Sequence, residues 1–515
     1  MNESRDPQSF KEACTNQQWR EAMDAEMKAI ERNHTWELVN PPEGVTPIGV
    51  KWIFKTKFNE SGHIEKYKAR LVAKGYAQRF GIDYTEVFAP VARLDTVRLI
   101  LALVAQNAWK VMQLDVKSAF LHGELQEEVY VQQPKGFIKK GKEDHIYRLK
   151  KALYGLKQAP RAWYSKIEAY FAKERFERCS NEHTLFTKRI HDNILIVRLY
   201  VDDLIFTGNS KDMCDEFKNS MKAEFDMTDL GHMRHFLGIE VIQSNTGIFI
   251  CQRQYAHDVL ARFNMTESNS VRNPIVPGTI LSKDIEGSAV DATKFKQVVG
   301  SLMYLTVTRP DLMFRVSLIS RYMANPKESH WAAAKRLLRY LKGTLEYGIF
   351  YQEKTKTGLM AYSDNNYAGD LDDRRSTYGA VLLIGNGAVS WMSKKQPVVS
   401  LSTTEAEYIA AASCACQCIW IQRILEHLSS AEKEATEILC DNSSTIQLSK
   451  NPVFHGRSKH IAVRFHFLRD LVNDKVVRLT YCCSNEQVAN IMTKALNLDQ
   501  FEKSDTCLEL QQLLK

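Results

Sequence analysis

Two adjacent acidic residues, Asp202 and Asp203, interrupt the otherwise apolar stretch LYVDDLIFTG at residues 199–208. Burying an unpaired carboxylate is costly, and two neighbouring carboxylates also repel each other. The apolar runs on both sides predict two strands, with the acids at the tip of a two-residue hairpin, where Asp tolerates positive φ. A plain turn needs no such acids, whereas a divalent cation favours carboxylate oxygen. The pair therefore indicates a cation site.

A third acid, Asp115, ends a short predicted strand in VMQLDVKSAFLHGEL at residues 111–125, and Phe120 follows it closely. A cation usually takes further ligands from other segments. Asp115 is a candidate, although acids at strand ends are common and this one is a weak signal by itself.

A basic segment from Lys51 to Arg79 contains eight Lys or Arg residues but only two Glu residues, interleaved with aromatic residues. Cationic side chains release counterions from a phosphate backbone, so a polyanionic partner is one interpretation. A solvated strand with Lys at its edges is the other, and composition does not choose between them.

The chain has 515 residues, of which 44% are hydrophobic and 25% charged, with a net charge of +8. This length predicts roughly two to four globular domains. We expect neither a signal peptide nor a transmembrane segment, because no apolar run approaches the roughly 20 residues that cross a bilayer. The eleven Cys residues form no regular framework, which favours reduced thiols in an intracellular protein.

Periodicity and turn residues divide the chain coarsely. A leading amphipathic helix fits residues 17–31, a mixed α/β region extends to about residue 245, and residues 295–346 are mainly helical. A polar linker is predicted at 352–358. Two apolar runs around a Gly-Asn-Gly turn then predict a hairpin at 378–393.

Two clusters could suggest a zinc site. The sequence CACQC (Cys414, Cys416, Cys418) lies in a predicted helix, where residues two apart point to different faces, so core residues are favoured over metal ligands. The run FHGRSKHIAVRFHF at 454–467 has three His residues but no Cys. A basic surface along a nucleic acid is favoured there.

Several segments resemble the copia-type LTR retrotransposon polyprotein in its reverse transcriptase and RNase H portion. These segments are QLDVKSAFLHGEL, YVDD, KARLVAKGYAQRFGIDYTEVFAPVARLDTVRLILAL (68–103), ALYGLKQAPRAWY (152–164), MTDLGHMRHFLGIEV (227–241) and GSLMYLTVTRPDLMF (300–314). The resemblance implies an α/β (α+β) fold, with a right-hand polymerase of fingers, palm and thumb followed by an RNase H-like mixed-sheet domain. The implied segments are an N-terminal helical leader (1–45), fingers and palm (46–245), thumb and connection (246–351) and the RNase H-like domain (358–515).

The resemblance implies that Asp115, Asp202 and Asp203 hold two Mg²⁺ ions, with Mn²⁺ as an alternative. Such ions activate a primer 3′-OH for attack on a dNTP and neutralise the leaving pyrophosphate. Phe120 matches the aromatic residue that packs under the sugar and excludes a ribose 2′-OH, with an ordinary core residue as the alternative. The residues matched to binding of the incoming nucleotide are Lys68, Arg70, Lys74, Phe120 and Gln158. A surface loop residue is the alternative for Gln158.

A second acid set resembles the RNase H domain of the same polyproteins. It lies in LMAYSDNNYAGD (359–370), LSTTEAEYIAAA (401–412) and ILCDNSSTIQL (438–448). The implied catalytic metal ligands, again for two ions, are Asp364, Glu407 and Asp441. Glu405 is the alternative to Glu407, because both cannot face one site from a helix, and the family spacing favours Glu407.

This sequence departs from the family at three positions of its second half. Asn490 and Asn366 stand where an Asp is usual, and Ala462 replaces an acid. An amide is neutral and binds a divalent cation more weakly than a carboxylate does. RNase H activity is therefore an open question, whereas the polymerase half shows no comparable loss.

Three functions are compatible with these residues: a polymerase with an active RNase H-like domain, a polymerase whose RNase H half is inactive, and a non-catalytic nucleic-acid-binding relic. The implied partners are an RNA template, a DNA primer, an RNA–DNA hybrid, dNTPs and other products of the polyprotein, but no membrane. The implied location is cytoplasmic, in a virus-like particle, and nuclear. We recognise no capsid, protease or integrase segment, which implies the C-terminal portion of a longer polyprotein or a truncated copy.

Overall fold

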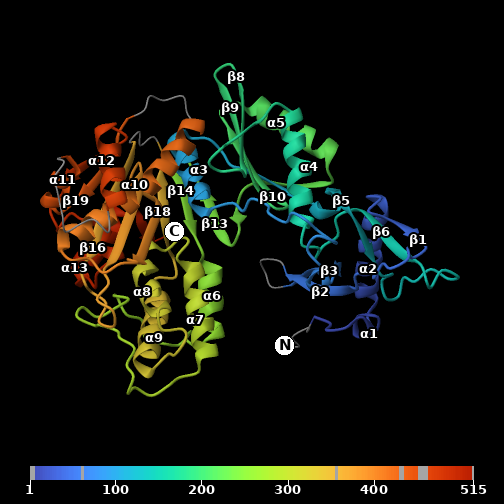
Figure 1. The fold of residues 1–515 in the computed structure, drawn as a ribbon, viewed down its shortest axis with the longest axis horizontal. Coiled ribbons are helices and arrows are strands. Elements are labelled where there is room, and N and C mark those ends of the chain that lie inside the picture. The colour runs from blue at the N-terminus through green and yellow to red at the C-terminus, as the bar shows by residue number, and fades with distance from the viewer. Residues whose placement is uncertain (1–5, 59–62, 354–357, 429–433, 451–461, 513–515) are drawn as a thin grey trace. The chain divides into compact units, whose positions relative to one another are not determined.

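Two compact units make up the chain in the computed structural model, which describes residues 6–58, 63–353, 358–428, 434–450 and 462–512 (Figure 1). The first unit comprises Met1–Ala92 and Gln113–Gly231, and the second comprises Arg93–Met112 and His232–Lys515. The predicted boundary at residue 245 does not coincide with this division, because strands on both sides of it join one sheet of the second unit. The assignment of the four segments remains a prediction.

The first long helix, α2 (Gln17–Arg32), matches the predicted helix at 17–31. It begins after Asn16, whose side chain accepts a hydrogen bond from the Gln18 N–H at 2.8 Å, as an N-cap residue does. Its apolar face is buried and packs against β3 (Ile64–Ala73). The helix thus packs within the first unit, and its assignment to an N-terminal helical leader remains a prediction.

Three sheets form the first unit. The largest has six strands in the order β11-β4-β10-β9-β8-β7, and the others are β1-β6-β5 and the β2-β3 ribbon. The elements are α1 (Phe10–Ala13), β1 (Trp36–Val39), β2 (Val50–Phe58), η1 (Gly75–Ala77), β4 (Met112–Val116), η2 (Ala119–His122), β5 (Glu124–Val131), β6 (Ile146–Lys151), α4 (Ala159–Lys173), β7 (Glu177–Arg178), β8 (Leu185–Ile190), β9 (Asn193–Tyr200), β10 (Asp203–Gly208), α5 (Lys211–Glu224) and β11 (Met227–His232), besides α2 and β3.

The second unit combines two five-stranded sheets with helices. Its elements are α3 (Leu94–Gln106), β12 (His235–Phe236), β13 (Ile239–Gln243), β14 (Gly247–Cys251), α6 (Arg253–Arg262), α7 (Ala292–Leu305), α8 (Pro310–Ser320), α9 (Glu328–Gly343), β15 (Tyr347–Gln352), β16 (Leu359–Asn366), β17 (Thr377–Ile384), β18 (Gly387–Lys395), α10 (Thr403–Leu428), β19 (Thr436–Cys440), α11 (Ser443–Lys450), α12 (Ala462–Asn473), β20 (Val477–Tyr481), η4 (Val488–Met492), α13 (Leu498–Cys507) and β21 (Leu510–Gln512).

The sheet that carries the second acid set is mixed. Its order is β18-β17-β16-β19-β20, in which β16, β17 and β18 pair antiparallel, and β19 pairs parallel with both β16 and β20. Helix α10 packs against β16, β17 and β19, and α8 packs against β18. The predicted hairpin at 378–393 is confirmed as β17 and β18, and the predicted helical stretch is confirmed as α7, α8 and α9.

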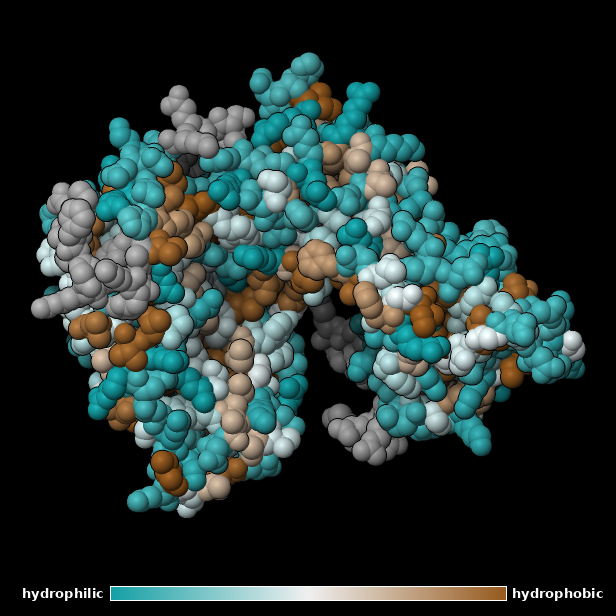
Figure 2. Space-filling model, viewed as in Figure 1, coloured by the Kyte–Doolittle hydropathy of each residue, from teal (hydrophilic) through white to brown (hydrophobic). Residues whose placement is uncertain are grey.

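Helix α10 corrects the expectation that no apolar stretch approaches a membrane span. Its 26 residues are long and apolar enough to cross a bilayer by length and composition alone. However, 56% of its apolar window is buried inside the protein, where it packs against the mixed sheet as a core helix does. On the face shown in Figure 2, hydrophilic residues predominate and hydrophobic residues lie in small separate groups.

A buried ionic group lies among the helices of the second unit. The Arg309 guanidinium donates to both carboxylate oxygens of Asp311 at 3.0 and 2.7 Å, and Tyr340 Oη donates to the same carboxylate at 2.8 Å. Asp505 is also buried, and its Oδ1 has no hydrogen-bond partner among the described residues. Burial, with the charge of Asp311 as the next cause, raises the pKa of Asp505 well above its usual range.

We expect Asp505→Asn to raise the free energy of unfolding at neutral pH by about 1–3 kcal/mol, because the amide cannot ionise and so removes the cost of burying this carboxyl. Because folding raises the pKa of Asp505, the folded state must take up a proton, and wild-type stability falls as pH rises above the unfolded pKa. The gain should therefore grow from acid to neutral pH in urea melts. Asp499→Asn, at the exposed start of the same helix, should give no such gain, and equal gains from both variants would contradict this account.

Candidate functional site

The three acids of the first set lie on neighbouring elements of the six-stranded sheet. Asp115 is in β4, and Asp203 begins β10, which lies between β4 and β9. The N–H of Val116 donates to the carbonyl of Asp202 at 2.8 Å. The turn that carries Asp202 is therefore bound to the strand that carries Asp115, although these residues are far apart in the sequence.

The turn between β9 and β10 differs from the predicted one. Tyr200 pairs with Asp203, so the two turn residues are Val201 and Asp202, and Asp203 already belongs to the strand. The left-handed backbone falls on Val201, at a φ of 53°, whereas the prediction assigned it to an Asp. A β-branched residue is strained in this conformation, so other contacts must hold the turn in place.

Trp163 supplies one of these contacts. Its indole N–H donates to the carbonyl of Val201 at 2.6 Å, and its side chain is buried in the first unit. The ring of Phe225 packs edge-on against it, with 5.5 Å between the ring centroids. Trp163 and the Val116 N–H thus bind both carbonyls of the two-residue turn.

Burial raises the pKa of Asp203 to about 6, and the charges of Asp202 and Asp115 add to this effect. Burial is also the main reason that the pKa of Asp115 is raised. Gln113 Nε2 donates to Asp203 Oδ1 at 3.3 Å. The oxygens of the first set do not form a tight group, because across the described ranges only the second set has ligand atoms within 4.8 Å of one another.

Lys68 is a predicted nucleotide-binding cation whose charge couples to Asp202 and Asp115, and the charge of Arg70 also couples to Asp115. It is half-buried in β3, and burial, together with Arg70 and Lys57, lowers its pKa. The carboxylates of Asp202 and Asp115 act in the opposite direction and favour the charged amine. Lys68 therefore lies within electrostatic reach of these acids.

Arg70 is engaged elsewhere. Its Nη1 lies 2.7 Å from Glu26 Oε2, and its guanidinium lies 5.5 Å from the centroid of the Tyr154 ring. Phe120, in η2, is half-buried against the same tyrosine, with 4.8 Å between ring centroids. Lys74 follows β3 and is half-buried. Of these predicted residues, Arg70 has a structural partner that the sequence did not indicate.

Gln158 is 2% exposed, so the alternative of a surface loop residue is wrong. Its Oε1 accepts from Gln78 Nε2 at 2.9 Å, and its Nε2 donates to the carbonyl of Asp83 at 2.8 Å. These bonds tie the start of α4 to a loop almost 80 residues earlier. Because the amide is used within the protein, a positioning role is favoured over direct contact with a nucleotide.

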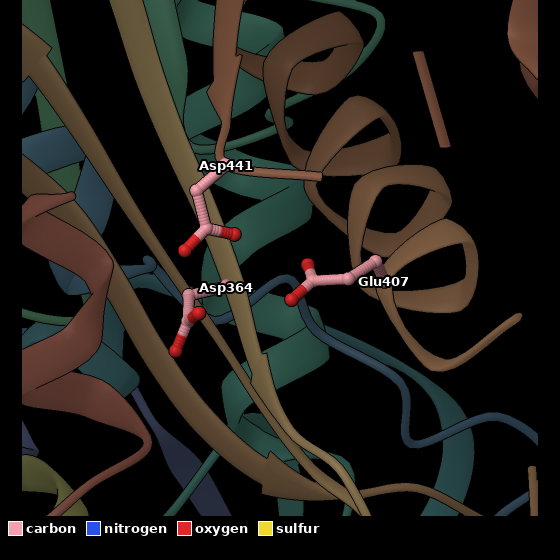
Figure 3. A group of neighbouring side chains, drawn as sticks. All are labelled: Asp364, Glu407 and Asp441. Atoms are coloured by element: carbon pink, nitrogen blue, oxygen red, sulfur yellow. The ribbon is translucent and has the colours of Figure 1, made fainter. Parts of the chain in front are cut away.

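The second acid set converges on one place. Asp364 lies in β16, Glu407 in α10 and Asp441 just after β19, and their ligand oxygens lie within 4.8 Å of one another (Figure 3). Figure 3 shows Glu407 reaching from its helix toward the other two acids. Glu405 instead accepts a hydrogen bond from the Leu401 N–H at 3.0 Å, at the start of its own helix.

These carboxylates are buried, and the negative charge of each disfavours ionisation of the others. Burial raises the pKa of Glu407 to about 9, and the charges of Asp364 and Asp441 add to this effect. Glu407 Oε2 is buried without a hydrogen-bond partner in the part of the chain that the structure describes. A buried oxygen left without a donor, beside two further acids, is a donor set that fits a hard divalent cation.

Two residues that the sequence did not single out bind Asp364. Thr493 Oγ1 donates to Oδ2, and Lys494 Nζ lies 3.0 Å from Oδ1. Gly379, which pairs with Asp364 across the strands, makes room for their segment, since a Cβ there would lie 2.4 Å from Met492 Cβ and 2.9 Å from Thr493 Cγ2. The only signal in the sequence was a glycine within an apolar strand, which marks a close approach.

The three departures from the family lie at different places. Asn490 Oδ1 accepts from Lys494 Nζ at 2.9 Å, and its Nδ2 donates to the carbonyl of Ser484 at 2.9 Å. Asn366 ends β16. Ala462 begins α12, with a side chain that lies outside the described residues.

The sulfur and imidazole clusters form no metal site where the chain is described. Cys414 and Cys418 are buried in α10, Cys416 is exposed, and none belongs to a group of converging ligand atoms. The favoured interpretation as core residues is confirmed for Cys414 and Cys418 and is wrong for Cys416. Of the histidines at 454–467, His455 and His460 lie outside the described residues, and His466 is exposed.

Comparison with known proteins identifies relatives along the chain. Residues 33–277 match the family model of reverse transcriptase (RNA-dependent DNA polymerase). The chain is 41% identical over 498 residues to the retrovirus-related Pol polyprotein from transposon RE2 of Arabidopsis thaliana, covering 96% of this chain and 34% of that protein. The corresponding polyprotein from transposon TNT 1-94 of Nicotiana tabacum is 39% identical over 523 residues, covering 99% and 39%.

A shorter relative is matched almost throughout. The putative transposon Ty5-1 protein of Saccharomyces cerevisiae is 33% identical over 301 residues, covering 58% of this chain and 98% of that protein. The chain spans about a third of the length of the Arabidopsis relative. A solved structure of LC11-RNase H1 in complex with RNA/DNA hybrid aligns with 26% of this chain and 94% of that chain, at 11% identity and a TM-score of 0.21.

We expect Gly379→Ala to lower the free energy of unfolding of the second unit by about 1–3 kcal/mol, as overpacking does. The added methyl meets Met492 Cβ and Thr493 Cγ2, which lie close to the backbone and cannot easily move. Denaturant melts measure the change. Gly300→Ala, at an exposed position of helix α7 with no atom within 4 Å of the new Cβ, should be neutral or stabilising. Equal losses in both variants would contradict the close approach.

Proposed function

Because this chain belongs to the copia-type retrotransposon Pol polyproteins, we propose that it is an RNA-directed DNA polymerase with an RNase H-like domain that acts on RNA–DNA hybrids. One observation carries the proposal. Within the region matched by the reverse transcriptase model, Asp115 lies on the strand that binds the carbonyl of Asp202, with Asp203 next in the chain.

In this proposal the first acid set binds two Mg²⁺ ions, or Mn²⁺, which supply activation of the primer 3′-OH and charge neutralisation of the triphosphate. The chain itself contributes positioning. Asp115 is fixed by its strand, and Asp202 lies on a turn whose carbonyls are both hydrogen-bonded. The pKa of Asp203 is raised to about 6, so protons compete with cation binding at and below that pH.

The incoming nucleotide is proposed to lie near β3 and η2. Lys68 is our first choice for the triphosphate because its charge is coupled to Asp202 and Asp115, and Lys74 is the second. We assign Arg70 a positioning role, since it is bound to Glu26. Phe120 keeps its proposed role of excluding a ribose 2′-OH.

The right-hand arrangement is also part of the proposal. We assign β4, β9 and β10 to the palm, β2 and β3 to the fingers, and α7, α8 and α9 to the thumb and connection. The mixed sheet with α10 is the proposed RNase H-like domain, since its three acids come from a central strand, its neighbour and the helix packed on them.

The proposed partners are an RNA template, a DNA primer, the RNA–DNA hybrid and dNTPs. The net charge of +8 and the basic β2–β3 segment support a polyanion. The Arabidopsis thaliana relative is about three times as long as this chain, which supports other polyprotein products as partners. A virus-like particle in the cytoplasm, and the nucleus, remain the proposed locations.

A second candidate function is a polymerase whose RNase H half does not cut. It is favoured by Asn490, which stands where the family has an acid and has its amide oxygen bound to Lys494. Under this candidate the second half would hold the hybrid without cleaving it. Hybrid cleavage by the wild type, lost in Asp364→Asn, would exclude it.

We expect Asp202→Asn to lower dNTP incorporation on a primed RNA template with Mg²⁺ by a factor on the order of 10³ or more, because a ligand of the activating cations is lost. Asp192→Asn is a matched control, since Asp192 is an exposed turn residue at the other end of β9. It should change the rate less than about twofold. A wild type that incorporates no dNTP would refute the polymerase proposal.

We expect Trp163→Phe to lower kcat for dNTP incorporation about tenfold, close to the free energy of one hydrogen bond, with KM for dNTP nearly unchanged. The variant removes the bond to the Val201 carbonyl but keeps an aromatic ring in the core. Trp36→Phe makes the same chemical change at an indole that stacks on Tyr147. If both variants lose the same activity, or if Trp163→Phe acts only on thermal stability, Trp163 does not position the turn.

A further inference from the structure

Lys494 lies between two oxygen atoms beside the second acid set. Its Nζ is 3.0 Å from Asp364 Oδ1 and 2.9 Å from Asn490 Oδ1. Asp364 is fully buried, whereas the Lys494 side chain is 38% exposed and enters from the solvent. The ammonium therefore occupies a position lined by a buried carboxylate oxygen and an amide oxygen, which both favour a positive charge.

A separate position for a cation lies among the three acids. The ligand oxygens of Asp364, Glu407 and Asp441 lie within 4.8 Å of one another, as Figure 3 shows. Glu407 is 6% exposed, and its buried Oε2 has no hydrogen-bond partner among the described residues. This oxygen is therefore free to act as a ligand. Asp364 therefore borders both positions, one filled by an ammonium and one lined by carboxylates.

The backbone of Lys494 is fixed from two sides. Its N–H donates to the carbonyl of Asn490 at 2.9 Å, and its carbonyl accepts from Arg315 Nη2 of α8 at 3.0 Å. Arg315 is 3% exposed, and its Nη1 has no partner within the described ranges. Burial alone lowers the pKa of Arg315 well below its usual range, which shows that no acid compensates it. A buried guanidinium without an acid is costly, so this anchor on Lys494 is a specific feature of the fold.

We propose that Lys494 supplies the second positive charge of this site, so that the acid set binds one divalent cation instead of the two predicted from the family. The inference rests on the proposed function, because it concerns the site assigned there to hybrid cleavage. A divalent cation and an ammonium together balance three carboxylates. A fourth carboxylate, as the family has at the position of Asn490, would add negative charge that a second divalent cation can balance.

Lys494 acts through Asp364 and is therefore a positioning residue. Its ammonium holds Oδ1 in place, while Thr493 holds Oδ2. Asn490 is the acceptor that suits this role, because a neutral amide binds the ammonium without adding to the negative charge around Asp364. On this view Asn490 and Lys494 work as a pair.

Calorimetric titration with Mn²⁺ on the full chain measures the number of ions at this site. The number of ions bound by the second acid set is the number bound by the wild type minus the number bound by Asp364→Asn. Ions at the polymerase site cancel in this difference. We expect a difference of one ion per chain for the wild type. We expect two when the same comparison is made in an Asn490→Asp/Lys494→Met background. Asp441→Asn replaces Asp364→Asn if the latter does not fold, as judged by circular dichroism.

Lys503→Met is the matched control, because Lys503 donates to the carbonyl of Asn485 and does not contact the acids. It should keep one ion and an Mn²⁺ affinity within about twofold of the wild type. Two Asp364-dependent ions in the wild type, or one in the double-variant background, would overturn the inference.

Hybrid cleavage with Mg²⁺, measured on the same proteins, separates this inference from the proposed function. If the wild type binds one ion but cuts no hybrid, the nuclease proposal fails and the one-cation site stands. If the wild type cuts but binds two ions, the nuclease proposal stands and the role of Lys494 fails.

Discussion

Repulsion between neighbouring carboxylates is the constraint that both candidate sites must overcome. Acids that share a site destabilise one another, and burial strengthens the effect because it removes the screening of water. The raised pKa values of Asp203, at about 6, and Glu407, at about 9, result first from burial and next from this repulsion. Such side chains would separate if they were free to do so. The rest of each unit must therefore hold them together.

In both units the course of the backbone brings the groups that hold the acids together into contact. The turn before Asp203 keeps a strained Val201 because its two carbonyls are bound by Trp163 and by the Val116 N–H. Around Asp364, a glycine in the neighbouring strand allows the segment after η4 to approach closely enough for its hydroxyl and ammonium groups to reach the carboxylate. Contacts to backbone carbonyls fix the turn of the first set without adding charge, whereas Lys494 holds Asp364 with a compensating positive charge.

The features that could be predicted from the sequence are those set by local pattern. Helix α2 follows from its apolar spacing, and the β17–β18 hairpin follows from two apolar runs around a glycine turn. The acids of the second set could be named because the segments that contain them resemble the RNase H domain of the family. The apolar character of helix α10 was underestimated because polar residues interrupt its sequence, which therefore contains no long uninterrupted apolar run.

The features that could not be predicted depend on contacts between distant residues. The turn register at Val201 is set by strand pairing and by Trp163, 38 residues earlier. Gln158 is buried because its partner Gln78 lies 80 residues away, and Lys494 meets Asp364 across 130 residues. No periodicity encodes such pairs. Chemistry-bearing residue types could be recognised, but not the neighbours that support them.

The same constraint changes how the loss of an acid should be judged. In a cluster of like charges, replacing one carboxylate by an amide removes a ligand but also removes repulsion. At Asn490 the amide oxygen binds an ammonium that in turn binds Asp364, so the charge around Asp364 is still compensated. The replacement and the lysine therefore have to be considered together. The relevant quantity is the number of positive charges that the remaining acids require, rather than the number of acids that match a family pattern.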